Sequence, residues 1–197
     1  MMNATIPAQG LRVAALAADA PKLRLGLPAS GDGAQIHALV GRCPPLDLNS
    51  PYAYLLLCHH FADTCVVALR GERVVGFIAA YCPPGNPAVV FVWQVAVDAP
   101  ERGHSLGNAM LAELLARPVL AQVDTLETTV TPSNLASRRM FLNFAAAQQA
   151  GVAEQSLFAA SDFGAAAHEE EILLRIEGLR AAANLSCPSP RAAIRGE

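Results

Sequence analysis

The sequence predicts one α/β (α+β) domain in which a mixed β-sheet carries helices on both faces. Its 197 residues are enough to bury a single sizeable hydrophobic core. With 53% hydrophobic and 16% charged residues, the chain is far from the composition of a disordered protein. Segments typical of strands and helices follow one another in the order β-α-α-β-β-β-α-β-α-β-β. This order is typical of a sheet that helices cover on both sides.

The first third of the chain predicts one strand and two helices. Residues 23–27 form a short apolar segment and are expected to be the first strand. The turn at residues 30–33 then starts a helix whose apolar side chains recur at helical spacing. Pro44 and Pro45 stop this helix, and a second helix fits residues 51–59, with a proline in its first turn.

The middle of the chain predicts a hairpin, a long strand and a helix. Residues 64–69 and 73–81 are β-branched and apolar, and a glycine-containing connection joins them as in a hairpin. Residues 88–97 are the longest strand candidate, and their nearly continuous apolar run predicts a strand covered on both faces. A leucine-rich stripe over residues 106–115 predicts the next helix, which Pro118 ends.

The last third completes the predicted sheet. We expect a strand at 123–130, a helix at 134–149 and two short strands at 156–158 and 172–176. Met140, Phe141 and Phe144 are expected to face the core from this helix. Residues 1–20 and 181–197 have no periodic apolar face. They are therefore predicted to be a flexible leader and a flexible tail around a domain at 21–180.

Charge and cysteine usage exclude several classes of protein. The net charge is −3 and there is no run of Lys or Arg, so a nucleic-acid partner is not expected. No apolar stretch is long enough to cross a bilayer, and no basic segment precedes the apolar residues near the start. The five cysteines are odd in number and show no C-x-x-C spacing, which favours free thiols in a reducing compartment over zinc or disulfides. The sequence thus predicts a cytoplasmic protein without a metal or a membrane partner.

The strongest local candidate for a site is the junction between the strand at 88–97 and the helix at 106–115. The loop between them contains Gly103 and is followed by Gly107 in the first turn of the helix. Glycines let the backbone approach a ligand closely, and the N–H groups of a helix N-terminus attract anions. The junction therefore fits an anion cradle, although a plain strand-to-helix turn is an equal alternative from these features alone.

The same loop resembles the acetyl-CoA loop of the GNAT superfamily, Arg/Gln-x-x-Gly-x-Gly/Ala. Arg102, Gly103 and Gly107 fit this pattern, whereas Ser105 stands where its central glycine is expected. The family pattern continues with a strand and an Asn-x-x-Ser/Ala helix start, which Asn134 matches. Many GNAT proteins carry a tyrosine seven residues further on, which protonates the departing thiolate. That position is Phe141 here, so the general-acid role does not transfer.

Four segments together are similar to the L-2,4-diaminobutyrate γ-acetyltransferases of ectoine synthesis. They are residues 43–57, 91–97, 129–134 and 168–171, within a resemblance that runs from about residue 24 to 176. The resemblance implies a GNAT fold, with a mostly antiparallel sheet and a splayed pair of fourth and fifth strands. It also implies acetyl-CoA and L-2,4-diaminobutyrate as the two substrates. A homodimer is expected, because two-fold dimers are the commonest closed assembly.

The resemblance implies where acetyl-CoA binds. The pantetheine arm is expected to pair with the backbone of Val95 and Val97, as an added strand does. A backbone N–H near Val95 would also serve the developing oxyanion, a role usually worth about 3 kcal/mol. The full set of expected cofactor residues is Val95, Ala96, Val97, Arg102, Gly103, His104, Ser105, Leu106, Gly107 and Asn134.

The resemblance also implies a substrate pocket with carboxylates for the amines. Asp47 and Glu171 are the expected catalytic and substrate-binding carboxylates, with Glu171 as a possible proton acceptor. Tyr52 and Trp93 are expected to wall the pocket, and His168 is a weaker candidate ligand. Structural alternatives stay open for Asp47 as a helix cap, for Trp93 as core, and for the acidic run at 169–171 as a solvated strand start.

Two other functions stay open. The chain could be a GNAT enzyme for another amine, either a small molecule or a protein lysine. The stiff proline-rich loop before Asp47 favours a closed small-molecule pocket over an open groove. It could also be a degenerate CoA-binding module without catalysis, which the departures at Ser105 and Phe141 favour.

Overall fold

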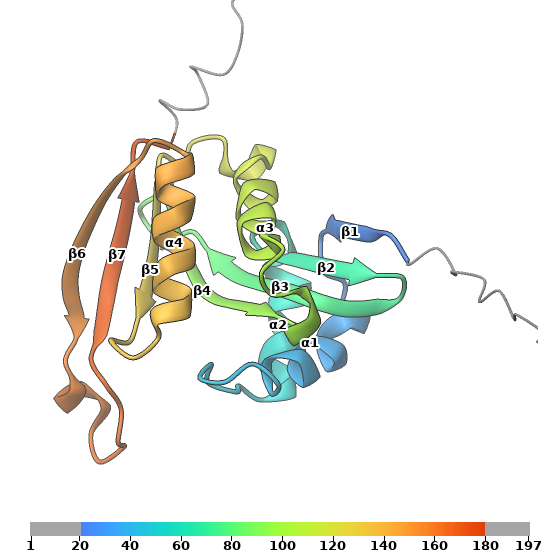
Figure 1. Ribbon diagram of the computed structural model, residues 1–197, viewed down its shortest axis with the longest axis horizontal. Coiled ribbons are helices and arrows are strands. Elements are labelled where there is room, and N and C mark those ends of the chain that lie inside the picture. Colours follow the sequence, from blue (N-terminus) through green and yellow to red (C-terminus); the bar gives the residue numbers. More distant parts are fainter. Residues whose placement is uncertain (1–20, 180–197) are drawn as a thin grey trace, which may run out of the picture.

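The computed structural model describes residues 21–179, and its core is a seven-stranded sheet (Figure 1). The strands are β1 (Leu23–Gly26), β2 (Val66–Arg70), β3 (Arg73–Tyr81), β4 (Val89–Val97), β5 (Thr125–Val130), β6 (Gly151–Phe158) and β7 (Glu171–Glu177). The α-helices are α1 (Gly33–Val40), α2 (Pro51–His60), α3 (Leu106–Leu115) and α4 (Leu135–Ala147). The predicted order of elements is confirmed. The predicted leader and all of the predicted tail lie outside the described residues.

The sheet is mixed and mostly antiparallel, as expected. Its strand order is β1-β2-β3-β4-β5-β7-β6, and every neighbouring pair is antiparallel except the parallel pair β4–β5. The β2–β3 hairpin turns at Gly71, whose φ of 62° lies in the left-handed region that glycine adopts without strain. The predicted hairpin is therefore confirmed.

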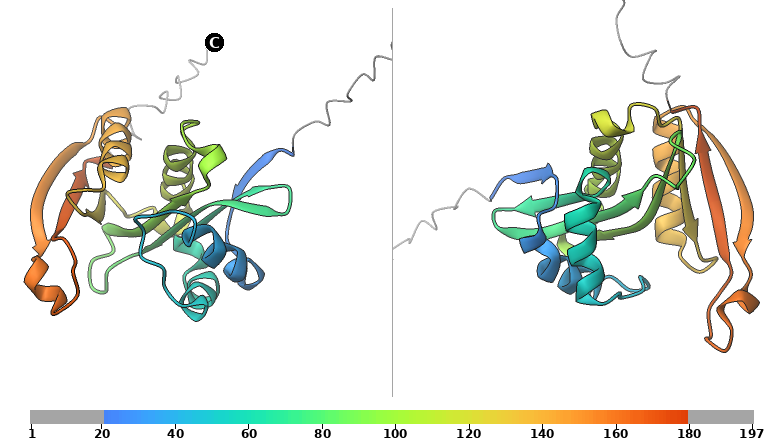
Figure 2. Two further views of the ribbon diagram at one scale, coloured as in Figure 1. Left: turned by 60° about the horizontal axis from the view of Figure 1, so that its bottom comes forward. Right: turned by 180° about the vertical axis from the view of Figure 1, so that it is seen from behind.

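Helices cover both faces of the sheet (Figure 2). One apolar cluster joins α1 and α2 to one face, and it contains Ile36, Tyr54 and Phe77. A second cluster joins α3 and α4 to the other face, and its members include Met110 and Phe144. Burying one such large side chain contributes on the order of 1.5–3 kcal/mol, so the helices are held by packing against the sheet.

Strand β4 contains a β-bulge at Trp93. Ala79 of β3 pairs with Gln94, but the next residue, Ala80, pairs with Val92, so Trp93 has no partner on β3. The extra residue changes which face the following side chains occupy. Trp93 is 44% exposed, and the prediction that this strand is covered on both faces is wrong at the bulge.

Strands β4 and β5 separate after a short stretch of pairing. Their parallel register covers only residues from Val89↔Thr125 to Val92↔Thr128, although β4 continues to Val97. The half of β4 beyond Val92 pairs with β3 on one side and leaves its other edge open toward α4. The splayed strand pair implied by the GNAT resemblance is thus confirmed.

The largest difference from a predicted element boundary is at β6. Strand β6 begins at Gly151, where its pairing with β7 starts, rather than at residue 156; its eight residues are all exposed and show no alternation of apolar and polar side chains that could have revealed this start. The α2 helix is capped by Ser50, whose hydroxyl accepts from the Ala53 N–H at 3.3 Å. The alternative role of Asp47 as that cap is therefore excluded.

Candidate active site

The junction after β4 has two residues with left-handed backbone conformations just before helix α3. Gly103 has a φ of 82° and Ser105 a φ of 58°, both in the left-handed region. Ser105 precedes the ten-residue helix α3, and its side chain does not cap that helix. The N–H groups of the first turn of α3 are therefore left without that side-chain acceptor, at the positive end of the helix dipole.

Arginines neutralise the carboxylates of this loop. Arg70 binds Glu101 through two hydrogen bonds of 2.7 Å, and this pairing lowers the pKa of Glu101 below its ordinary value. Asp98, which is 5% exposed, pairs with Arg73 and with Arg42 at 3.4 Å. The loop thus presents little net negative charge to an anionic ligand despite its two acidic residues.

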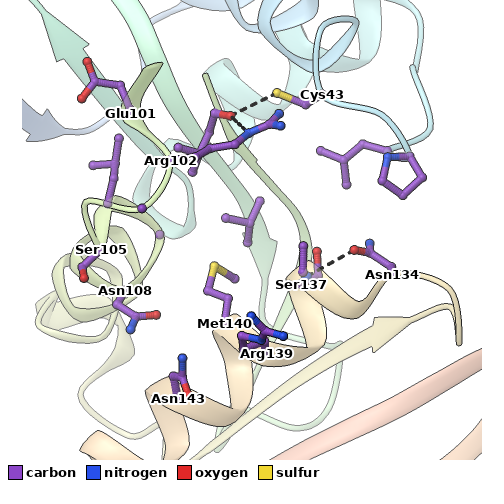
Figure 3. A pocket seen from close by; sticks show the side chains of 18 of the residues that line it. Cys43, Glu101, Arg102, Ser105, Asn108, Asn134, Ser137, Arg139, Met140 and Asn143 are labelled. Atoms are coloured by element: carbon purple, nitrogen blue, oxygen red, sulfur yellow. Dashed lines mark hydrogen bonds between the residues drawn. The ribbon is translucent and has the colours of Figure 1, made fainter. Parts of the chain in front are cut away.

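A pocket of about 450 Å³ opens between this loop, the free edge of β4 and the facing side of α4 (Figure 3). The predicted cofactor residues Val95, Val97, Arg102, Gly103, Ser105, Leu106, Gly107 and Asn134 all line it. Two predicted residues do not: Ala96 is fully buried on the opposite face of the sheet, and His104 is exposed outside the lining. Asn134 also caps α4 by accepting from the Ser137 N–H at 3.2 Å.

The pocket contains polar residues that the motif did not predict. Arg139 and Asn143 lie one helical turn apart on α4 and both point to the pocket (Figure 3). Asn108 of α3 faces them, and its Oδ1 is the one buried side-chain oxygen or nitrogen without a partner within residues 21–179. Their i, i+4 spacing puts both side chains on one face of a helix, and this was the sequence signal that could have identified Arg139 and Asn143 as site residues. An unsatisfied buried amide oxygen and a guanidinium suit a large polar ligand.

The open edge of β4 offers backbone groups to the pocket. The Val97 carbonyl accepts from Cys43 Sγ at 3.4 Å and from Arg102 Nε at 3.0 Å, so it points away from β3. Residues two apart in a strand present their backbone groups to the same edge. Val95 therefore presents its N–H and carbonyl to the same side as Val97.

A second group of predicted residues meets beside the pocket. The Nε2 atom of His168 lies 3.7 Å from a carboxylate oxygen of Asp47 and 3.9 Å from one of Glu171. The His168 Nδ1 atom lies 2.6 Å from the Glu169 carbonyl, and Phe163 stacks on the imidazole at a centroid distance of 3.9 Å. That carbonyl bond, followed by the two carboxylates, raises the pKa of His168 above its ordinary value.

The three glutamates at the start of β7, residues 169–171, have three different partners. Glu169 accepts from the N–H of Ser133 at 3.1 Å, beside Asn134. Glu170 accepts from Ser156 of β6 at 3.1 Å, and Glu171 faces His168. The side chain of Glu171 is only 18% exposed, so the reading of the whole run as a solvated strand start is wrong for this residue.

Tyr52 and Trp93 lie at the surface. Tyr52 is 66% exposed in the first turn of α2, and Trp93 is 44% exposed at the bulge of β4. The structure therefore excludes the alternative of Trp93 as a core residue. Their assignment as walls of a substrate pocket stays a prediction, because neither lines the pocket described above.

Phe141, Cys58 and Cys65 are not parts of the site chemistry. Phe141 is 3% exposed in the core, where a phenyl ring can neither donate nor accept a proton. The four cysteines within residues 21–179 are free thiols. Burial raises the pKa of Cys58 to about 12 and that of Cys65 to about 11, so neither is a reactive thiolate. Over the same residues there is no group of three His, Cys, Asp or Glu side chains placed to hold a metal ion.

Comparison with known proteins agrees with this geometry. Residues 34–145 match the model of the acetyltransferase (GNAT) family, so the chain belongs to that family. Within it, the chain is 54% identical to an L-2,4-diaminobutyric acid acetyltransferase of Bordetella parapertussis over 160 residues, which are 81% of this chain and 86% of the relative. The enzyme of the same name from Halalkalibacterium halodurans is 41% identical over 78% of this chain and 81% of its own length.

A solved structure shares both the fold and the sequence. It is the diaminobutyrate acetyltransferase of Paenibacillus lautus in complex with its substrate L-2,4-diaminobutyric acid and coenzyme A. The two chains superpose with a TM-score of 0.78 and 38% identity over 81% of this chain and 96% of that one. None of the helices within residues 21–179 is both long and apolar enough to span a membrane.

Proposed function

We propose that this protein transfers the acetyl group of acetyl-CoA to the γ-amine of L-2,4-diaminobutyrate. The products are N-γ-acetyl-L-2,4-diaminobutyrate and CoA, and the reaction is the first dedicated step of ectoine synthesis. The observation that carries the proposal is the 54% identity to the Bordetella parapertussis enzyme over 81% of the chain. The similarity to a structure that holds both diaminobutyric acid and coenzyme A supports it.

The pocket fits acetyl-CoA, which supplies the reactive thioester. Its phosphates would lie against Arg102 and the N–H groups at the start of α3, while the loop carboxylates are held by arginines. The open edge of β4 offers the backbone groups of Val95 and the N–H of Val97 to the pantetheine arm, whereas the Val97 carbonyl already accepts from Cys43 and Arg102. Arg139 and Asn108 supply further polar contacts from the opposite walls.

The residues of the second group provide the amine chemistry. The Asp47 and Glu171 carboxylates both lie within 4 Å of Nε2 of His168, at 3.7 and 3.9 Å, and can each accept from a substrate ammonium. The attacking amine has to lose a proton before it forms the amide, and Glu171 accepts that proton directly or through water. A backbone N–H at Val95 then donates to the carbonyl oxygen as negative charge develops on it.

The proposal predicts both the product and the effect of losing either carboxylate. Purified protein, acetyl-CoA and diaminobutyrate should give product acetylated only on the γ-amine, as located by NMR. Asp47→Asn and Glu171→Gln should each lower kcat/KM for diaminobutyrate about ten- to a hundredfold, because a charge-assisted hydrogen bond is worth roughly 1.5–3 kcal/mol. At least one of the two should also release α-acetylated product.

Glu170→Gln is the matched control for these variants. It removes the neighbouring carboxylate, which binds Ser156 of β6 instead of facing His168. Its kcat/KM should equal that of the wild type. If Asp47→Asn and Glu171→Gln are as active and as γ-selective as Glu170→Gln, the assignment of both carboxylates is wrong.

The two other functions are outcomes of the same assay. Faster acetylation of another small amine would identify a different GNAT enzyme. Binding of CoA without turnover of any amine would identify a CoA-binding module, the alternative that Ser105 and Phe141 favoured. The identity to named diaminobutyric acid acetyltransferases over most of the chain supports the first proposal over both.

We also propose a cytoplasmic homodimer. The β6 strand pairs only with β7 and exposes all eight of its residues, among them Val152, Leu157 and Phe158. An exposed apolar edge strand of this length favours pairing with another chain. Light scattering should give twice the mass of the chain, and the mass of a single chain would contradict the dimer.

A further inference from the structure

The side chain of Gln94 is an unusual feature of the central strand. It is 5% exposed in a strand that is otherwise almost entirely apolar. The bulge at Trp93 turns it toward the face covered by α1 and α2, where Tyr54 is fully buried. A buried amide is costly unless its donor and acceptor are both satisfied, so its partners indicate what it does.

Both ends of the Gln94 amide are bonded, and one bond reaches the substrate site. Its Nε2 donates to the backbone carbonyl of Asp47 at 2.7 Å. Its Oε1 accepts from the Tyr54 hydroxyl at 3.2 Å, and the same hydroxyl accepts from the Asn49 N–H at 3.3 Å. The buried pair Gln94–Tyr54 therefore binds the backbone on both sides of residue 48.

The segment that these bonds hold needs such an anchor. Asp47 lies in the irregular connection between α1 and α2, and its side chain is 83% exposed. The carboxylate meets its neighbour His168 only at 3.7 Å, which is too long for a strong hydrogen bond. The position of the carboxylate is thus set by its backbone, and the 2.7 Å bond from Gln94 is the shortest contact on that backbone.

We propose that Gln94 and Tyr54 are positioning residues for the substrate carboxylate Asp47. They connect the splayed strand, where the thioester would lie, to the loop whose carboxylate receives a substrate ammonium. A shift of that loop changes the distance between the held amine and the reacting centre, and about 1 Å is enough to lose much of the rate. The inference rests on the proposed function and specifies how one of its two carboxylates is placed.

The test is a double-mutant cycle with Asp47. Tyr54→Phe removes only the hydroxyl, and Gln94→Met removes the amide at similar volume. Each variant should raise KM for diaminobutyrate about five- to tenfold with KM for acetyl-CoA unchanged, because each loses buried hydrogen bonds to the loop. In an Asp47→Ala background the same substitutions should have almost no further effect, since their action passes through that carboxylate.

Several outcomes would overturn the inference. If the fold-increases in KM for diaminobutyrate caused by Gln94→Met and Asp47→Ala multiply in the double variant, Gln94 acts independently of Asp47. If Gln94→Met does not fold, Tyr54→Phe decides, and a wild-type KM for diaminobutyrate in that variant refutes positioning. Gln122→Met, at an exposed residue before β5, is the control and should leave all constants unchanged. A wild-type protein that does not acetylate diaminobutyrate would refute the proposed function instead.

Discussion

Replacing Ser105 with glycine tests whether a departure from the family loop costs stability or binding. Ser105 has φ 58° and ψ 20°, a conformation that costs a residue with a Cβ about 1–2 kcal/mol. Glycine adopts it freely, but it adds roughly 0.4–1 kcal/mol of conformational entropy to the unfolded chain. The free energy of unfolding should therefore rise by about 0–1.5 kcal/mol. For a domain of this size that corresponds to an increase in Tm of up to roughly 5 °C.

Ser105→Ala separates the hydroxyl from the Cβ in the same experiment. Alanine keeps the strained conformation, and the hydroxyl it removes does not cap α3. We expect Ser105→Gly to be about 1 kcal/mol more stable than Ser105→Ala in thermal unfolding. The Kd for acetyl-CoA, measured by calorimetry, should be unchanged or lower for the glycine variant.

Two results would refute this reasoning about Ser105. A glycine variant that is less stable than the wild type by 1 kcal/mol or more would show that the left-handed conformation stores no strain. Weaker acetyl-CoA binding in both variants would show that the hydroxyl contacts the ligand.

Two further predictions concern the site. The KM for diaminobutyrate should fall as pH rises through the raised pKa of His168, above its ordinary value of about 6.5. Below that pKa the imidazolium pairs with Asp47 and Glu171 and competes with the substrate ammonium. In His168→Gln the KM for diaminobutyrate should therefore no longer change over this pH range. If the pH dependence of KM in the variant equals that of the wild type, this role of His168 is wrong. Gly107→Ala should raise the Kd for acetyl-CoA about tenfold, because its Cβ would clash with Sδ of Met140 and push that side chain into the pocket. Adding Met140→Ala should restore binding, and failure to do so would exclude this steric cause.

Most of the fold could be predicted from the sequence because its elements carry local signals. The helix α2 has a proline in its first turn and a serine cap, and the β2–β3 hairpin has a glycine at its left-handed turn residue. The start of β6 could not be predicted, because residues 151–155 are all exposed and their apolar and polar side chains do not alternate. A strand without a buried face leaves no alternating pattern.

The candidate site, like the fold, could be predicted from the sequence only in part. The loop proposed to bind the cofactor is continuous in sequence, so Arg102, Ser105 and Gly107 could be matched to a motif, and all three line the pocket. The opposite wall comes from α4, where Arg139 and Asn143 share a face but belong to no motif. Their role depends on the distance between two helices, which hydrophobic periodicity does not encode.

The bulge of β4 shows why local pattern alone was insufficient at the centre of the molecule. Val92 faces the cluster under α3 and α4, and in a regular strand Gln94 would face it too. Its amide would then lie among apolar side chains without the hydrogen bonds to Tyr54 and Asp47, at a cost on the order of 1–3 kcal/mol.

The extra residue, Trp93, removes that conflict. It sends Gln94 to the other face, returns Val95 to the cluster with α3, and coincides with the point where β5 leaves β4. One inserted residue therefore places a buried amide against the loop that carries Asp47, at the point where the backbone edge proposed for the pantetheine arm begins. For this reason we expect deletion of Trp93 to lower the free energy of unfolding far more than replacement of its side chain, because only the deletion changes the faces that Gln94 and Val95 occupy.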